Sequence, residues 1–213
     1  MKLRLLCAAL LSLTFSTTIL AQAQTQTPAQ KPKPPEPVSA PMSEDAANGS
    51  AKSPAEKYFS DVELIDQDGR KLRFYSDVLK DKVVVINTFF TTCKSICPPL
   101  NRNFQKIQEA LGDRLGKDAI LISITVDPVT DTPTRLKEYS KLFKAQPGWL
   151  FLTGKKENVD WALYKLGQYV EAKDDHTSIV IIGNEPKGLW KKAMGLANAD
   201  ELIKIVEDVI NDR

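Results

Sequence analysis

Two cysteines are the residues of this sequence best suited to redox chemistry or to binding a soft metal ion. Cys93 and Cys97 are separated by three residues and are followed directly by Pro98 and Pro99. Because proline is accommodated in the first turn of an α-helix, we expect both cysteines on a loop at a helix N-terminus, not along a helix face. There the helix dipole and Lys94 both favour the thiolate. A structural disulfide is the alternative, although a loop this short restricts the unfolded chain only weakly.

His176 is the only histidine of the chain, and it stands in the run Asp174-Asp175-His176-Thr177. Taken alone, a single histidine is more often a surface or packed residue than a ligand. Together with two thiolates it makes a candidate metal site of three ligands. Structural zinc normally takes four protein ligands, so a closed zinc site would need a further carboxylate or water. Thiolates favour copper(I) and imidazole suits copper(II), so copper fits this set better.

Two carboxylates follow a predicted strand, in the run Asp127-Pro-Val-Thr-Asp131-Thr-Pro133. Asp131 or Thr132 is expected to cap a helix that begins at Pro133. Asp127 lies at the carboxyl edge of the strand and is the better candidate for a supporting role beside the cysteines. We therefore interpret Asp131 as structural and Asp127 as a candidate supporting residue of the site.

The pattern of apolar residues predicts an α/β domain in which strands and helices alternate. Asp68 and Gly69 lie between two short apolar runs and indicate a β-hairpin. The expected elements are this hairpin at 62–75, strands at 83–90, 119–126, 149–152 and 178–182, a short partner strand around Trp190, and helices at 100–115, 133–143, 159–166 and 198–210. Such alternation predicts a mainly parallel central sheet with helices on both faces, and the hairpins and the C-terminal helix favour a thioredoxin-like sandwich.

That fold would bring the candidate residues together. A thioredoxin-like sandwich has its chemistry where the first buried strand meets the following helix, and Cys93 and Cys97 are at that junction. The loop before the strand at 178–182 faces the same junction. We therefore expect His176, which lies in this loop, to be opposite the two cysteines.

The N-terminal residues have the pattern of an export signal followed by a spacer. A basic start, an apolar stretch to about Phe15 and the sequence Ala21-Gln22-Ala23 predict a cleaved signal peptide at 1–23, which includes Cys7. The Pro-rich run at 24–55 has few large apolar side chains and is expected to be a disordered spacer. The folded domain is then expected at 56–213. The protein would be exported and periplasmic, where disulfides can form, or loosely membrane-associated if the signal is retained.

Charge and hydropathy exclude several classes of protein. The chain has 29 Lys and Arg against 27 Asp and Glu, and removal of Lys2 and Arg4 with the signal leaves 27 against 27. A nucleic-acid-binding protein would have an excess of basic residues on one face, so no nucleic-acid partner is expected. No apolar run approaches the roughly 20 residues that cross a bilayer, so no stable membrane span is expected either.

The motifs described above, taken in order, resemble the Sco/SenC family. The resemblance runs from about Phe59 to the C-terminus. The motifs that support it are Asp66-Gln-Asp-Gly69, Cys93-x-x-x-Cys97-Pro98, Asp127-Pro-x-x-Asp131-Thr-Pro133, Leu152-Thr-Gly154 and Asp175-His176-Thr177. Family members often have Pro and then Asp after the first cysteine, where this chain has Lys94 and Ser95.

The resemblance implies a thioredoxin-like fold with a copper ion held by Cys93, Cys97 and His176. It also implies that the protein delivers copper to the binuclear copper site of cytochrome c oxidase, or reduces the cysteines of that site. The partner would then be the copper-site subunit of that enzyme or a related copper protein.

Two functions of different classes are compatible with these residues. A copper-binding chaperone would use all three, whereas a periplasmic thiol–disulfide oxidoreductase would need only Cys93 and Cys97 as a redox-active pair. The usual oxidoreductase spacing is C-x-x-C, one residue shorter than here, and His176 would have no role in it. A thiol peroxidase is less consistent with the sequence, because Phe90 and Ile86 occupy positions where that class usually has Thr and Pro.

Overall fold

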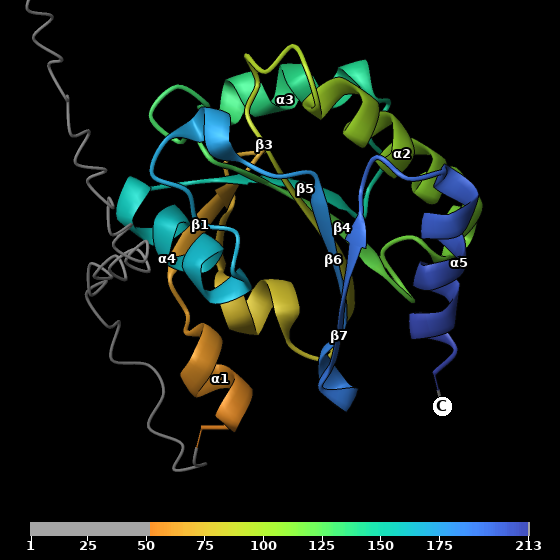
Figure 1. Cartoon of the computed structure of the whole chain (residues 1–213). Coiled ribbons are helices and arrows are strands. Elements are labelled where there is room, and N and C mark those ends of the chain that lie inside the picture. The colour runs from red at the N-terminus through yellow and green to blue at the C-terminus, as the bar shows by residue number, and fades with distance from the viewer. Residues whose placement is uncertain (1–51, 213) are drawn as a thin grey trace, which may run out of the picture. The chain divides into compact units, whose positions relative to one another are not determined.

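One sheet of seven strands is the framework of the part of the chain that the computed structural model describes, residues 52–212 (Figure 1). The predicted signal peptide and most of the predicted spacer lie outside these residues. The strands are β1 (Glu63–Asp66), β2 (Lys71–Arg73), β3 (Val83–Phe89), β4 (Ile120–Thr125), β5 (Trp149–Thr153), β6 (Ile179–Asn184) and β7 (Leu189–Met194). The α-helices are α1 (Pro54–Phe59), α2 (Cys97–Leu111), α3 (Pro133–Leu142), α4 (Lys156–Leu166) and α5 (Ala199–Ile210). Shorter helices are the π-helix η1 (Phe74–Leu79) and the 3-10 helices η2 (Gly112–Arg114), η3 (Lys173–Asp175) and η4 (Glu185–Lys187).

The sheet is mixed, with parallel strands at its centre and antiparallel strands toward both edges. Its strand order is β2-β1-β5-β4-β3-β6-β7. Strands β3, β4 and β5 run parallel, whereas the β1–β2 hairpin joins β5 antiparallel, and β6 and β7 are antiparallel on the other side. The parallel strands predicted for the centre of the sheet are therefore present, and an antiparallel hairpin forms each edge. The predicted N-terminal hairpin is confirmed, and its turn contains Gly69 at φ +80°.

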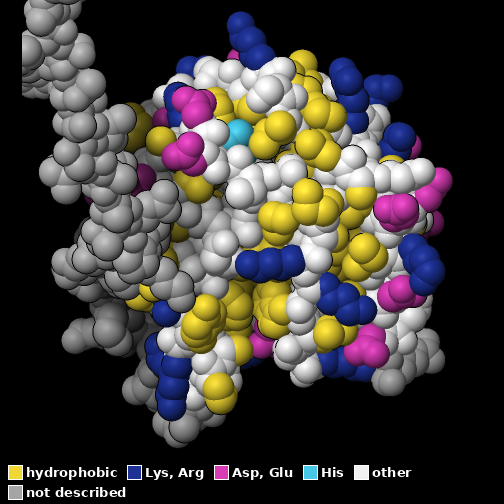
Figure 2. Space-filling view, in the orientation of Figure 1, with side chains coloured by type: hydrophobic (Ala, Val, Ile, Leu, Met, Phe, Trp, Pro, Cys, Tyr) yellow, Lys and Arg dark blue, Asp and Glu magenta, His cyan; other side chains and the backbone are white. Residues whose placement is uncertain are grey.

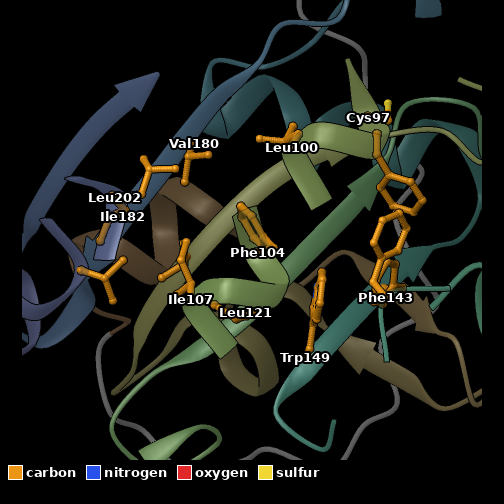
Figure 3. Close-up of a cluster of buried hydrophobic side chains, with 14 of the residues drawn as sticks. Cys97, Leu100, Phe104, Ile107, Leu121, Phe143, Trp149, Val180, Ile182 and Leu202 are labelled. Atoms are coloured by element: carbon orange, nitrogen blue, oxygen red, sulfur yellow. The ribbon is translucent and has the colours of Figure 1, made fainter. Parts of the chain in front are cut away.

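Helices cover both faces of the sheet, as predicted, and each face has its own apolar core. On one face α2, α3 and α5 pack against the strands, with Phe104 and Trp149 fully buried between them. Figure 3 shows this core, in which Leu100, Phe104 and Ile107 follow one another along α2 and Cys97 lies at the end of the row. The other face is covered by α1, η1 and α4. The end of α2 that contains Cys97 is thus anchored in a packed core.

The pairing of β3 with β6 brings two loops together that are distant in the sequence. The two strands are antiparallel, with Val83 opposite Asn184 and Ile86 opposite Ile181. The carboxyl end of β3 therefore lies beside the start of β6. As a result, the loop after β3, which contains Cys93, meets the loop before β6, which contains His176.

The second half of the predicted hairpin differs from the structure. A strand was expected at residues 73–75, but β2 ends at Arg73 and the chain continues as the π-helix η1. Phe74 and Tyr75 are both buried, and so are Val78 and Leu79. Neighbouring residues of a strand point to opposite faces, so an edge strand would not bury both members of each pair. Two adjacent buried pairs four residues apart fit one face of a helix.

The first described helix begins two residues before Glu56, the residue at which the folded domain was expected to start. Helix α1 begins at Pro54, and the hydroxyl of Ser53 caps it by accepting a hydrogen bond from the Glu56 backbone N–H at 3.1 Å. Ser and Pro at these positions are typical of a helix start. The prediction did not use this signal, because the spacer as a whole has few large apolar side chains. Of the helices in residues 52–212, none has the length and apolarity needed to cross a membrane.

Candidate metal centre

Both cysteines lie where β3 leads into α2. Strand β3 ends at Phe89, residues 90–96 form a loop, and α2 begins at Cys97. Cys97 is therefore the first residue of the helix and not a loop residue as predicted, because the Ile96 carbonyl accepts from the Leu100 N–H at 3.1 Å and closes a turn around it. Cys97 is fully buried, whereas Cys93, in the loop, is 7% exposed.

The imidazole of His176 lies against both sulfurs. Its Nε2 is 3.1 Å from the Sγ of Cys97 and 3.9 Å from the Sγ of Cys93. Its Nδ1 is 2.8 Å from the carbonyl oxygen of Lys173, and since a carbonyl oxygen can only accept, Nδ1 has the proton in the neutral ring. Nε2 therefore directs its lone pair toward the sulfurs, which is the tautomer required of a metal ligand. Phe90 packs edge to face on the ring, with 5.0 Å between the two ring centroids.

Within residues 52–212, Cys93, Cys97 and His176 form a buried group that could hold a metal ion. Their ligand atoms all lie within 4.8 Å of one another, so the convergence expected from the fold is observed. Both cysteines are free thiols in this structure. Two soft sulfurs and one imidazole fit an ion that is thiophilic and accepts few ligands, such as copper(I), better than structural zinc with its four protein ligands.

Burial and hydrogen bonding give the two thiols different acidities. Burial raises the pKa of the Cys97 thiol far above its ordinary value, and the hydrogen bond with Cys93 raises it further. Burial also acts to raise the pKa of Cys93, but hydrogen bonds from Cys97 and Ser95 outweigh it and hold that pKa below its ordinary value. Burial lowers the pKa of His176, so the imidazole is neutral near pH 7. The site thus combines one thiol of lowered pKa with a neutral imidazole.

A buried carboxylate fixes the loop that contains Cys93. Asp131 is fully buried and accepts hydrogen bonds from the Thr91 backbone N–H at 3.0 Å, from the Thr125 hydroxyl at 2.6 Å and from the Thr91 hydroxyl. It thereby joins the residues before Cys93 to the end of β4. Helix α3 is capped by Thr132 instead. The role predicted for Asp131, a possible helix cap, is thus replaced by a contact with the cysteine loop that the sequence pattern did not indicate.

Asp127 lies near the site and is connected to His176 through Lys173. The Nζ of Lys173 donates to Asp127 at 2.7 Å, and the backbone carbonyl of the same lysine accepts from His176. The Lys173 ammonium also lies 5.2 Å from the centre of the Phe90 ring. Burial acts to raise the pKa of Asp127, but hydrogen bonds from Lys173 and Thr130 hold it below its ordinary value. Lys173, which the sequence analysis did not single out, therefore links the predicted supporting carboxylate to the imidazole.

Comparison with protein families and curated proteins gives consistent matches. A family model described as SCO1/SenC matches residues 50–211. SCO2-like protein RC0895 of Rickettsia conorii is 40% identical over 103 residues, which are 48% of this chain and 48% of that protein. The chain thus spans about half the length of curated relatives such as this one.

Solved structures match over a larger share of the chain. BsSco, a member of the Sco family of cytochrome c oxidase assembly proteins in which a disulfide switch was identified, is 26% identical with a TM-score of 0.60. That match covers 73% of this chain and 94% of BsSco. Yeast Sco1 with copper bound is 26% identical with a TM-score of 0.57, covering 70% of this chain and 90% of the yeast chain. These likenesses confirm the predicted thioredoxin-like fold.

Proposed function

Because this chain belongs to the SCO1/SenC family, we propose that it binds a copper ion through Cys93, Cys97 and His176. The observation that supports this most directly is the orientation of the imidazole, whose Nδ1 donates to the Lys173 carbonyl while Nε2 faces both sulfurs. Thiolates favour copper(I) and imidazole suits copper(II), so the set can serve both oxidation states. Copper is bound in the related structure of yeast Sco1.

In this proposal the protein is a chaperone and copper is its cargo. It delivers copper to the binuclear copper site of cytochrome c oxidase, or reduces the cysteines of that site. The relationship to BsSco, from a family of cytochrome c oxidase assembly proteins, supports this assignment. The signal-like sequence at 1–23 supports export to the periplasm. The partner is then the copper-site subunit of the oxidase or a related copper protein.

The second candidate is a thiol–disulfide oxidoreductase that uses the same cysteines. Its supporting observation is that both thiols are free and adjacent, with Cys93 7% exposed and Cys97 fully buried. In such a reaction Cys93 and Cys97 become a disulfide, and a partner disulfide takes up their electrons and protons to become two thiols. This function does not require the imidazole, which provides the means to separate the two candidates.

The decisive measurement is a competition titration of the reduced protein with a copper(I) chelator, comparing wild type with His176→Ala. We expect the substitution to weaken copper(I) binding by at least about tenfold, because it removes a ligand and not only a residue that orients one. It should also change the copper(II) spectrum, while the rate of disulfide formation stays close to that of wild type. Thr177→Ala is the matched control, since it alters the next side chain without touching the sulfurs. Equal affinities for wild type and His176→Ala would favour the oxidoreductase.

The link from Asp127 through Lys173 to His176 leads to a second expected result. Lys173→Met removes the ammonium that Asp127 holds at 2.7 Å but keeps an unbranched side chain and the carbonyl that orients the imidazole. Copper affinity should fall by about tenfold, the lower end of what outer residues of metal sites contribute. Asp127→Asn should cause a similar loss.

A double-variant cycle tests whether these two residues act as one unit. Lys173→Met combined with Asp127→Asn should lose no more affinity than either single variant, because the same contact is removed in each case. Lys155→Met, at an exposed lysine before α4, is the control for loss of charge. Losses that simply add in the double variant would contradict the link.

A further inference from the structure

A groove opens beside Cys93, between the first half of α2 and the end of α3. Its volume is about 440 Å³. Its lining includes Cys93, Lys94, Arg102, Tyr139, Leu142 and Phe143. Of the three residues of the metal centre, Cys93 lines this groove, whereas Cys97 and His176 do not. A molecule in the groove would therefore reach the centre through the Cys93 sulfur.

The groove combines an apolar surface with basic charge. Leu142 is 72% exposed at its rim, and Phe143 and Tyr139 form part of its wall. Lys94 and Arg102 also line it, and none of the described residues in the lining is acidic. Figure 2 shows hydrophobic side chains gathered on one side of the histidine and Asp and Glu side chains on the other. The lining of this groove beside Cys93 is thus basic, in a chain whose charge is nearly balanced overall.

We propose that this groove, between α2 and α3, is the docking site for an acidic segment of a partner protein that presents a cysteine to Cys93. The proposal rests on the proposed function and specifies the chemistry of the partner. Acidic side chains complement Lys94 and Arg102, and an apolar side chain of the segment would pack on Leu142. A cysteine is required because only a soft ligand competes with Cys93 for copper(I), and only sulfur exchanges with its thiol.

The test uses Cys93 as a reporter that does not depend on copper. In the full chain with Cys7→Ser and Cys97→Ser, Cys93 is the remaining thiol. The probes are two synthetic peptides of equal length, each with one cysteine activated as a pyridyl disulfide, flanked by Glu in one and by Lys in the other. The Cys93 thiolate attacks the peptide sulfur, the peptide–pyridyl S–S bond breaks and the protein–peptide S–S bond forms. The pyridinethiolate that leaves takes up a proton, and its absorbance measures the rate.

We expect the Glu-flanked peptide to react about tenfold faster than the Lys-flanked peptide at low salt, because steering by complementary charge raises association rates. The difference should shrink as salt is added. Arg102→Glu should abolish or reverse the preference. Lys106→Glu is the matched control: it makes the same charge change one turn further along α2, at an exposed residue outside the groove lining, and should keep the preference. Leu142→Ser should slow both peptides.

Three results would overturn the docking site. The first is equal rates for the two peptides, the second is a preference that survives Arg102→Glu, and the third is an equal effect of Arg102→Glu and Lys106→Glu, which would indicate the general field of the protein. Copper(I) competition with the Arg102→Glu chain, cysteines intact, separates this proposal from the proposed function. The copper(I) affinity of this variant should equal that of wild type. If wild type itself binds no copper, the proposed function is rejected, while the peptide rates still test the docking site.

Discussion

Replacing Cys97 with serine should lower the affinity for copper(I) by more than about a hundredfold, which exceeds the usual effect of residues that only orient a metal ligand. Cys97 supplies the sulfur closest to the imidazole, at 3.1 Å from Nε2. A serine hydroxyl is a hard oxygen and does not replace a thiolate for a soft ion. The measurement is the same chelator competition under anaerobic conditions, so that the thiols stay reduced.

Two further variants make that result specific. Cys93→Ser should cause a loss of the same order, since it removes the second sulfur. Ser95→Ala is the comparison: it removes a hydrogen-bonding neighbour 3.8 Å from the Cys93 sulfur but no proposed ligand, so its loss of affinity should be much smaller. Far-ultraviolet circular dichroism checks that each variant is folded. A folded Cys97→Ser protein with wild-type affinity would remove Cys97 from the site.

The free energy of unfolding should fall by at least about 3 kcal/mol when Asp131 is replaced by alanine, because three buried donors lose their acceptor and each costs about 1–3 kcal/mol. The donors concerned are the Thr91 N–H, the Thr91 hydroxyl and the Thr125 hydroxyl. Urea denaturation followed by circular dichroism measures this change. Asp131→Asn keeps one acceptor oxygen and should lie between alanine and wild type.

The control for this prediction is an aspartate on the surface. Asp113→Ala changes an exposed carboxylate in the turn after α2 and should alter stability by no more than about 0.5 kcal/mol. A loss below about 1 kcal/mol for Asp131→Ala would mean that water replaces the carboxylate at little cost. In that case the cysteine loop would not depend on Asp131 for its position.

The convergence of the cysteines and the histidine could be predicted because it follows from the order of the elements. Cys93 directly follows a strand that is apolar on both faces, and His176 directly precedes another. Once both strands belong to one thioredoxin-like sheet, the antiparallel pairing of β3 with β6 puts the loop after β3 and the loop before β6 at the same end of the sheet. The hairpins at the two edges were also predicted, from the Asp68-Gly69 turn and the short partner strand around Trp190, although apolar periodicity alone does not give the direction of a strand.

The supporting residues were harder to predict because their roles depend on contacts between loops. Asp131 stands one residue before a helix cap, a position where an exposed aspartate is common, and only the fold shows that Thr91 is its neighbour. Lys173 orients His176 through its backbone carbonyl, which no residue type signals. By contrast, η1 had a readable signal, since Phe74, Tyr75, Val78 and Leu79 repeat at helical spacing.

The distance in sequence between the cysteines and the histidine links the metal to the integrity of the sheet. Cys93 and His176 are 83 positions apart and meet only while β6 is hydrogen-bonded to β3. A metal ion bound by both loops would stabilise the paired strands by mass action and disfavour partial opening of the β6–β7 edge. Loaded and empty molecules would then differ in how often that edge opens, so amide hydrogen exchange along β6 would report the loading state without any probe at the metal.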